Sequence, residues 1–92
     1  MRVPSRRLTD ADAAIIKALM REGWLQSDIA SLMGCNSGRI AEIASGSKFS
    51  DIAAADLHTA DGASRLARLQ VDWTLRIGRQ LSAALRPSGT FF

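Results

Sequence analysis

The feature that most constrains the fold is a glycine that interrupts a helical pattern near the middle of the chain. Over residues 26–33 apolar side chains recur at helical spacing, with Ile29 and Ala30 on one face. Gly34 then suits the left-handed backbone conformation in which helices often end. Asn36 follows as an N-cap residue, and a second apolar pattern begins behind it. The sequence therefore predicts two short helices joined by a tight turn.

The second of these helices has an apolar face and a polar face. Ile40, Ile43 and Ala44 fall at spacings that place them together, facing inward. Cys35, just after the glycine, is the apolar residue expected to tuck under the turn. The remaining side chains are expected to point outward: Ser37, Gly38, Arg39, Ala41, Glu42 and Ser45.

This pattern resembles the helix-turn-helix of bacterial and phage regulators of the Cro and repressor type. The family pattern is met by Gln26, Ile29, Ala30, Gly34, Cys35, Asn36 and Ile40. One departure is Leu25, which stands where the family usually has a Thr or Ser cap, so the first motif helix should begin more weakly. The resemblance implies a DNA-binding protein whose second motif helix lies in the major groove.

The expected contacts with double-stranded DNA fall into two sets. Arginine can bind guanine and glutamate can accept from cytosine, so the set that reads base edges is Ser37, Gly38, Arg39 and Glu42. The set expected to contact the DNA backbone is Arg2, Arg6, Arg7, Gln26, Asn36, Ser45 and Lys48. Other interpretations stay open. The helix face and the basic arm can be plain solvated surface, and Arg39 can instead contact a phosphate or pair with Glu42.

The chain as a whole is expected to be all-α, with an N-terminal trihelical helix-turn-helix unit followed by a long amphipathic helix. Residues 1–8 are a basic arm, and residues 9–50 form the DNA-binding unit. Its first helix is capped by Thr9 and stopped by Gly23, and Trp24 and Leu25 close its corner. Residues 51–62 are an acidic joint with a short helix over 51–57, residues 63–86 are a packing or dimerisation helix, and residues 87–92 are a tail.

The long helix carries an apolar stripe that has two interpretations. Its members are Leu66, Leu69, Trp73, Ile77, Leu81 and Leu85. The stripe can cover the small trihelical core of its own chain. A helix of about six turns is nevertheless longer than such a core requires, so we expect a homodimer interface on this stripe, with Trp73 and Leu81 as anchors.

Neither a catalytic site nor a metal site is expected. His58 is the only imidazole, the acidic residues are scattered, and Cys35 has no second cysteine to pair with. We therefore expect no cofactor and no small-molecule substrate. The absence of an apolar run of about 18–20 residues argues against a membrane span, and a lone thiol suits a reducing compartment. The expected location is the bacterial cytoplasm, on the nucleoid when the protein is bound to DNA.

Charge distribution and motif together favour a DNA-binding regulator. The formal net charge is +3, with basic segments on both sides of the acidic joint. The expected function is a dimeric repressor or autoregulator of the mobile-element or phage kind, binding an inverted repeat. The alternative is a protein-interaction module, such as an antiactivator or adaptor that binds another regulatory protein, because helix-turn-helix folds also host roles without DNA.

Overall fold

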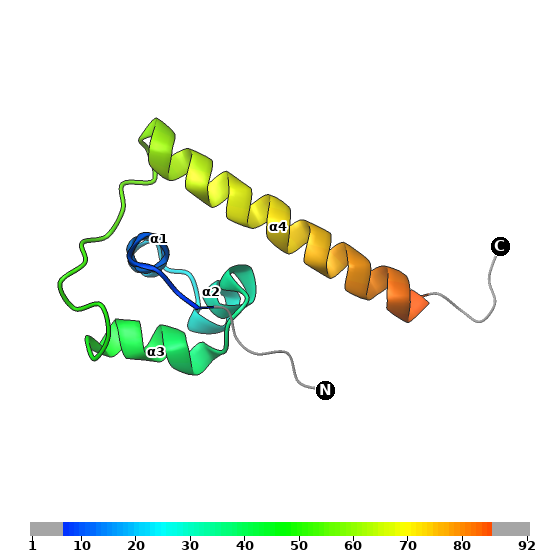
Figure 1. The fold of residues 1–92 in the computed structure, drawn as a ribbon, viewed down its shortest axis with the longest axis horizontal. Helices are drawn as coiled ribbons and strands as arrows, with labels where there is room; N and C mark the ends of the chain where they lie inside the picture. Colours follow the sequence, from blue (N-terminus) through cyan, green and yellow to red (C-terminus); the bar gives the residue numbers. More distant parts are fainter. Residues whose placement is uncertain (1–6, 86–92) are drawn as a thin grey trace.

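The computed structural model describes residues 7–85, with side chains described as far as Arg79, and this part of the chain is all-helical. It contains four helices: α1 (Asp10–Arg21), α2 (Gln26–Met33), α3 (Ser37–Ser45) and α4 (Ala60–Leu85). Figure 1 shows that the first three form a small unit and that α1 and α2 lie between α3 and the long α4. The predicted fold class is confirmed. None of the described helices is both long enough and apolar enough to cross a bilayer.

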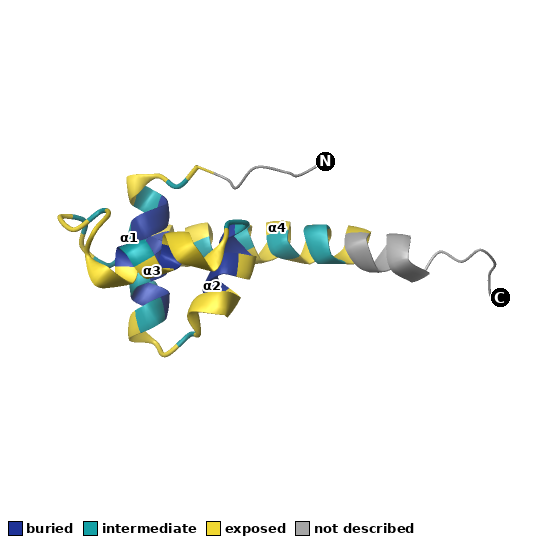
Figure 2. Ribbon diagram, turned by 90° about the horizontal axis from the view of Figure 1, so that it is seen from below, coloured by how far each residue is buried: buried dark blue, intermediate teal, exposed yellow. Residues whose placement is uncertain are grey.

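The core lies where α1, α2 and α3 meet (Figure 2). Its buried side chains come from all three helices: Ala13, Ile15, Ile16, Leu19, Ile29, Ala30, Leu32, Met33, Ile40 and Ile43. The inward face predicted for α3 is confirmed for Ile40 and Ile43 but is wrong for Ala44, which is exposed. Consecutive helical residues lie about 100° apart, and Ile43 takes the inward position in the last turn, so Ala44 turns toward solvent.

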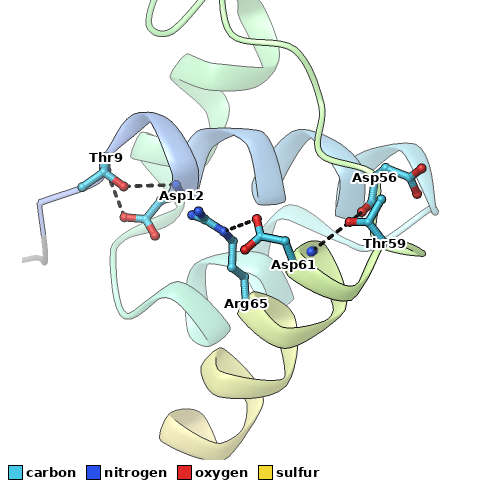
Figure 3. A network of polar contacts seen from close by, with 7 residues as sticks. Thr9, Asp12, Asp56, Thr59, Asp61 and Arg65 are labelled. Carbon is cyan, nitrogen blue, oxygen red and sulfur yellow. Dashed lines mark hydrogen bonds and ion pairs between the residues drawn. The ribbon is translucent and has the colours of Figure 1, made fainter.

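Helix α1 begins and ends where the sequence predicts. Thr9 forms a reciprocal capping box with Asp12, in which the Asp12 N–H donates to Thr9 Oγ1 at 3.2 Å and the Thr9 N–H donates to Asp12 Oδ2 at 2.9 Å (Figure 3). Gly23 ends the helix with φ +92°. Trp24 packs partly on the core, but Leu25 is 66% exposed, so the prediction that Leu25 helps close the corner is wrong. Leu25 occupies the N-cap of α2 in an extended conformation, which leaves its side chain outside the core.

The turn between α2 and α3 is built as predicted. Gly34 adopts the left-handed conformation, with φ +72°. Asn36 caps α3, because its Oδ1 accepts a hydrogen bond from the Arg39 N–H at 3.1 Å. Helix α2 begins after Leu25 with no side-chain hydrogen bond at its N-cap.

The segment between α3 and α4 is not helical, so the prediction of a short helix over 51–57 is wrong. The Lys17 ammonium group of α1 donates to the carbonyls of Phe49 and Ile52, at 2.6 and 2.5 Å. The Ala55 N–H donates to the Ala14 carbonyl, also in α1, at 2.9 Å. The backbone groups that a local helix would pair internally are instead bonded to α1. Phe49 packs against the core.

Helix α4 begins at Ala60, three residues earlier than the sequence predicts. Thr59 caps it: the hydroxyl accepts from the Gly62 N–H at 3.0 Å and donates to the Asp56 carbonyl at 2.9 Å (Figure 3). The Asp56 carbonyl lies so close that a Cβ at Gly62 would be 2.1 Å from its oxygen. The incoming chain therefore passes directly against the first turn of α4.

The apolar stripe of α4 covers the core of its own chain over the first half of the helix. Leu66, Leu69 and Trp73 are half-buried and pack against the core, which is the first of the two interpretations of the stripe. Ile77 is also half-buried. Leu81 and Leu85 lie outside the part of α4 whose side chains are described.

Two polar groups of α4 fix it to the C-terminal end of α2. The Trp73 indole N–H donates to Ser31 Oγ at 2.8 Å. The Arg76 guanidinium donates to the carbonyls of Ser31 and Leu32, at 3.2 and 2.8 Å, and Asp72 holds it from the preceding turn with an Nε–Oδ2 distance of 3.4 Å. A cation at these last carbonyls of α2 adds hydrogen bonds at the helix end and interacts favourably with the helix dipole. Helix α4 thus supports the helix-turn-helix through α2, and it lies on the side of the three-helix unit opposite α3 (Figure 1).

Candidate functional site

The outer face of α3 presents the polar side chains that the sequence assigns to base reading. Ser37, Gly38 and Arg39 are exposed, and Glu42 is half-buried. Ile40 and Ile43 fix the rotation of the helix, because both are buried against α1 and α2. The face that carries Arg39 and Glu42 is therefore held outward by the packing of the opposite face.

A shallow hollow of about 180 Å³ gathers charged groups from three parts of the chain. Arg7 comes from the segment before α1, Arg39 and Glu42 from α3, and Lys48 from the turn after α3. Its apolar wall consists of Leu8, Ile43 and Phe49. The hollow thus combines three cations with one carboxylate, and it brings together members of both sets of predicted DNA contacts.

The charged groups of this hollow are available for a ligand. Among the described residues, Arg39 forms no ion pair with Glu42, although the two lie three positions apart on α3. Arg7, Arg39 and Lys48 are exposed. The arrangement suits a polyanion that also offers hydrogen-bond donors and acceptors, because the guanidinium donates and the carboxylate accepts.

Gly38 has a structural role in addition to leaving the surface open. A Cβ at this position would lie 3.1 Å from Asn36 Oδ1, the atom that caps α3. That distance is tighter than most real Cβ contacts, so a larger residue at position 38 would press on the cap. Gly38 thus helps to fix the start of α3 while offering no side chain between the helix and a ligand.

The other residues that are predicted to contact the DNA backbone are more scattered over the protein. Gln26 and Asn36 are exposed at the N-terminal ends of α2 and α3. Ser45 is exposed, and its hydroxyl lies 3.2 Å from the Glu42 carbonyl, so a phosphate contact from Ser45 would replace that hydrogen bond. Arg2 and Arg6 lie outside the described residues.

Sequence reasoning missed the residue that places Lys48 beside α3. Lys17 bonds the carbonyls of Phe49 and Ile52, and so fixes the segment that carries Lys48. Phe49 has φ +56°, an uncommon conformation for a residue with a side chain, and its ring contributes to the hollow. A lysine inside the α1 pattern carries no sequence signal for this role, whereas the isolated Phe49 does suggest an anchor.

Residues 7–79 contain no group of three or more His, Cys, Asp or Glu that could hold a metal ion. Comparison of the chain with protein-family models, with curated proteins and with solved structures found no match. The function is therefore inferred from the residues of this chain alone.

Proposed function

We propose that the protein is a sequence-specific DNA-binding transcriptional regulator, a repressor or autoregulator that binds an inverted repeat as a homodimer in the bacterial cytoplasm. The observation that carries the proposal is the outward face of α3, where Arg39 and Glu42 line one hollow with the cations Arg7 and Lys48. A helix that follows a tight turn and leaves its polar face uncovered can enter a major groove.

The two ionic side chains of α3 have complementary roles in reading bases. Arg39 presents paired N–H donors that fit guanine O6 and N7, and Glu42 can accept from the amino group of cytosine. Gly38, one turn before Glu42, keeps the first turn of the helix slim, and Ser37 adds a small hydroxyl at its start. We therefore infer that the first two turns of α3 provide the specificity.

The cations around α3 contribute affinity for the phosphate backbone of the DNA. Arg7 and Lys48 lie on the same hollow as Arg39 but outside the helix. They suit phosphates beside the groove that α3 would occupy, and such contacts fix the register without reading sequence. The modest net charge of +3 favours this mixture over purely electrostatic binding.

A second candidate is a protein-interaction module. It is favoured by an apolar groove between α2 and α4, lined by Trp24, Leu25 and Trp73, which lies apart from the hollow beside α3. An adaptor of this kind would use the groove and would have no need of the cations around α3. The two candidates therefore differ in whether duplex DNA binds at all.

Selection of bound sequences from random duplex DNA, followed by affinity measurements at several salt concentrations, tests the proposal. A regulator gives an enriched motif and an affinity that falls steeply with salt, whereas an adaptor gives neither. Arg39→Ala should weaken binding to the enriched motif by about 1–3 kcal/mol. The matched control is Arg21→Ala, which removes an exposed arginine outside the hollow and should leave affinity nearly unchanged. Equal effects of the two substitutions would contradict the role of α3.

A further inference from the structure

Helix α4 carries a second apolar face, which points away from the rest of the described chain. Consecutive helical residues lie about 100° apart, so Val71 and Leu75 lie about 160° around α4 from Trp73, which packs on the core. They are 59% and 57% exposed, whereas the stripe that contains Trp73 is half-buried. In Figure 1 the other three helices all lie on one side of α4. Val71 and Leu75, together with Ser64, thus form an outer face of α4 that the described part of the chain leaves uncovered.

One edge of this outer face carries charges whose signs alternate along the helix. The edge lies about 40–80° from the centre of the outer face, and its members are Asp61, Arg68, Asp72 and Arg79, all exposed. Among the described residues neither arginine forms an ion pair. Each aspartate bonds an arginine four positions along α4 through one oxygen, and the aspartate side chains are 80% and 65% exposed. The alternating edge therefore offers two cations without a partner and two carboxylates that can each accept a further hydrogen bond.

We propose that the outer face of α4 pairs with the same face of a second copy of the chain, with the two helices antiparallel and the two-fold axis close to position 70. In this register Asp61 of each protomer lies level with Arg79 of the other, because that pair of positions is centred on position 70. Arg68 lies level with Asp72 of the other protomer for the same reason. One axis thus sets four opposite-charge pairs along the interface.

The charge pattern distinguishes an antiparallel pair from a parallel one. A two-fold axis across an antiparallel pair of helices places the same edge of both helices side by side, so the alternating edge meets its own copy. A parallel pair would place the alternating edge against the opposite edge of the outer face, where Ala67 and Thr74 lie and no charged residue occurs. Only the antiparallel arrangement therefore gives every charge on the edge a partner of opposite sign.

The apolar centre of the outer face agrees with the same register. With the axis at position 70, the two Val71 residues lie about 3 Å apart along the helix direction, at a rise of about 1.5 Å per residue. Each Leu75 then lies level with position 65 of the other protomer, beside the small side chain of Ser64. The axis that pairs the charges thus also brings the two valines together, although neither valine belongs to the charge pattern.

This pairing deepens the proposed function, on which it rests for its purpose, and the fold orients α3 suitably. The alternating edge lies toward the start of α1, because Asp12 and Arg68 line one pocket between α1 and α4. The hollow beside α3 is lined by Arg7 and Leu8, which come just before α1. An axis that places both alternating edges on one side of the dimer therefore places both hollows toward that side, as binding to an inverted repeat requires.

Sedimentation of the full chain over a range of concentrations tests the pairing. The wild type should form a dimer at tens of micromolar, and Leu75→Glu should raise the dimer Kd at least about tenfold, because it puts two charges into the apolar centre. The matched control is Leu25→Glu, since Leu25 is 66% exposed but lines the groove between α2 and α4, away from the outer face. Its Kd should equal that of the wild type. A monomeric wild type, or a dimer that Leu25→Glu weakens as much as Leu75→Glu, would overturn the proposal.

Mixing two charge-reversed variants tests the register. Arg79→Glu alone sets like charges at two of the four pairs, and Asp61→Arg alone does the same with the opposite sign. Each variant by itself should pair at least about fivefold more weakly than the wild type. In an equimolar mixture the heterodimer regains every opposite-charge pair, so its Kd should return to the wild-type value. A mixture that pairs no better than either variant alone would reject the register.

Disulfide formation tests the direction of the two helices. In a Cys35→Ala background, Val71→Cys lies next to the axis and should cross-link two protomers, since a disulfide needs Cα atoms within about 7 Å. Ser64→Cys lies on the same face but about 18 Å from its counterpart along an antiparallel pair, so it should not cross-link. Cross-linking of both variants would indicate a parallel pair, and cross-linking of neither would place the interface elsewhere; either result contradicts the proposal.

Binding to DNA is measured separately, so that the pairing and the proposed function can fail independently. Leu75→Glu should keep the wild-type affinity for a single half-site and lose affinity for the inverted repeat, which supports both. An unchanged affinity of Leu75→Glu for the inverted repeat would contradict the purpose assigned to the pairing. Failure of the wild type to bind DNA, with the sedimentation and cross-linking results as expected, would remove the proposed function and leave the pairing intact.

Discussion

Gly62 and Gly78 provide a matched pair of substitutions within one helix that tests how the chain enters α4. Both glycines lie in α4, yet their surroundings differ. A Cβ on Gly62 would lie 2.1 Å from the Asp56 carbonyl oxygen, whereas a Cβ on Gly78 would meet nothing within 4 Å. Replacing each glycine by alanine therefore makes the same chemical change in one crowded and one open position.

The expected magnitudes have opposite signs. Alanine is better than glycine inside a helix by about 0.5–1 kcal/mol, so Gly78→Ala should stabilise the protein by that amount. At Gly62 the Asp56 carbonyl or the helix must move by about 1 Å, and the carbonyl is itself bonded to the Thr59 hydroxyl. Overpacking of this kind costs about 1–3 kcal/mol, which exceeds the gain in helix propensity.

Thermal unfolding followed by circular dichroism measures the difference. For a domain of this size 1 kcal/mol corresponds to a Tm change of about 4–8 °C, so Gly62→Ala should lower Tm by up to roughly 20 °C and Gly78→Ala should raise it by roughly 2–8 °C. Both variants are compared with the wild type at the same protein concentration. Equal increases in Tm would show that the Asp56 carbonyl does not lie against the first turn of α4.

Three further substitutions test the supports of the helix-turn-helix by thermal unfolding. Arg76→Met removes two charged hydrogen bonds to the end of α2 and should lower the free energy of unfolding by about 1–3 kcal/mol. The control Arg79→Met, at an exposed position, should change it by less than about 0.5 kcal/mol. Similar losses of stability in the two variants would contradict the capping role of Arg76. Lys17→Met keeps the apolar stem of the side chain but loses both hydrogen bonds to the segment after α3, so it should lower the free energy of unfolding by about 1–3 kcal/mol. An unchanged Tm would show that this segment is held in another way. Ala30→Leu should overpack a site that is 5% exposed and cost about 1–3 kcal/mol, so wild-type melting would mean that α2 is not packed as described.

The sequence predicts the first half of the fold well because its signals there are local. Thr9, Gly34 and Asn36 act through the backbone within a few residues of themselves, and apolar spacing determines which faces are buried. The polar side of α3 follows from the same spacing. The exposure of Ser37 and Arg39 could therefore be predicted without knowledge of any tertiary contact.

The features that sequence reasoning missed depend on contacts between distant segments. The segment after α3 is not helical because Lys17 and Ala14 of α1 bond its backbone, whereas the short helix predicted over 51–57 rested on local sequence alone. No sequence pattern distinguishes Arg76 from the other arginines of α4, yet it caps α2 across 44 positions of sequence. The stripe on α4 was visible, but periodicity cannot distinguish the core of the same chain from a partner. The packing of Leu66, Leu69 and Trp73 on the core of their own chain therefore emerged only from the structure.

The most direct test of the central claim, that α3 reads DNA sequence, is a pair of selections from random duplex DNA carried out with the wild type and with Arg39→Ala. If Arg39 contacts one base pair, the two selected motifs should agree except at a single position in each half-site, where the variant loses a preference for guanine. Circular dichroism of the variant should remain that of the wild type, because Arg39 is exposed and contributes only its backbone N–H to the cap. The claim would be contradicted by the absence of any enriched motif for the wild type, or by a folded Arg39→Ala variant that selects the same motif with unchanged preferences at every position.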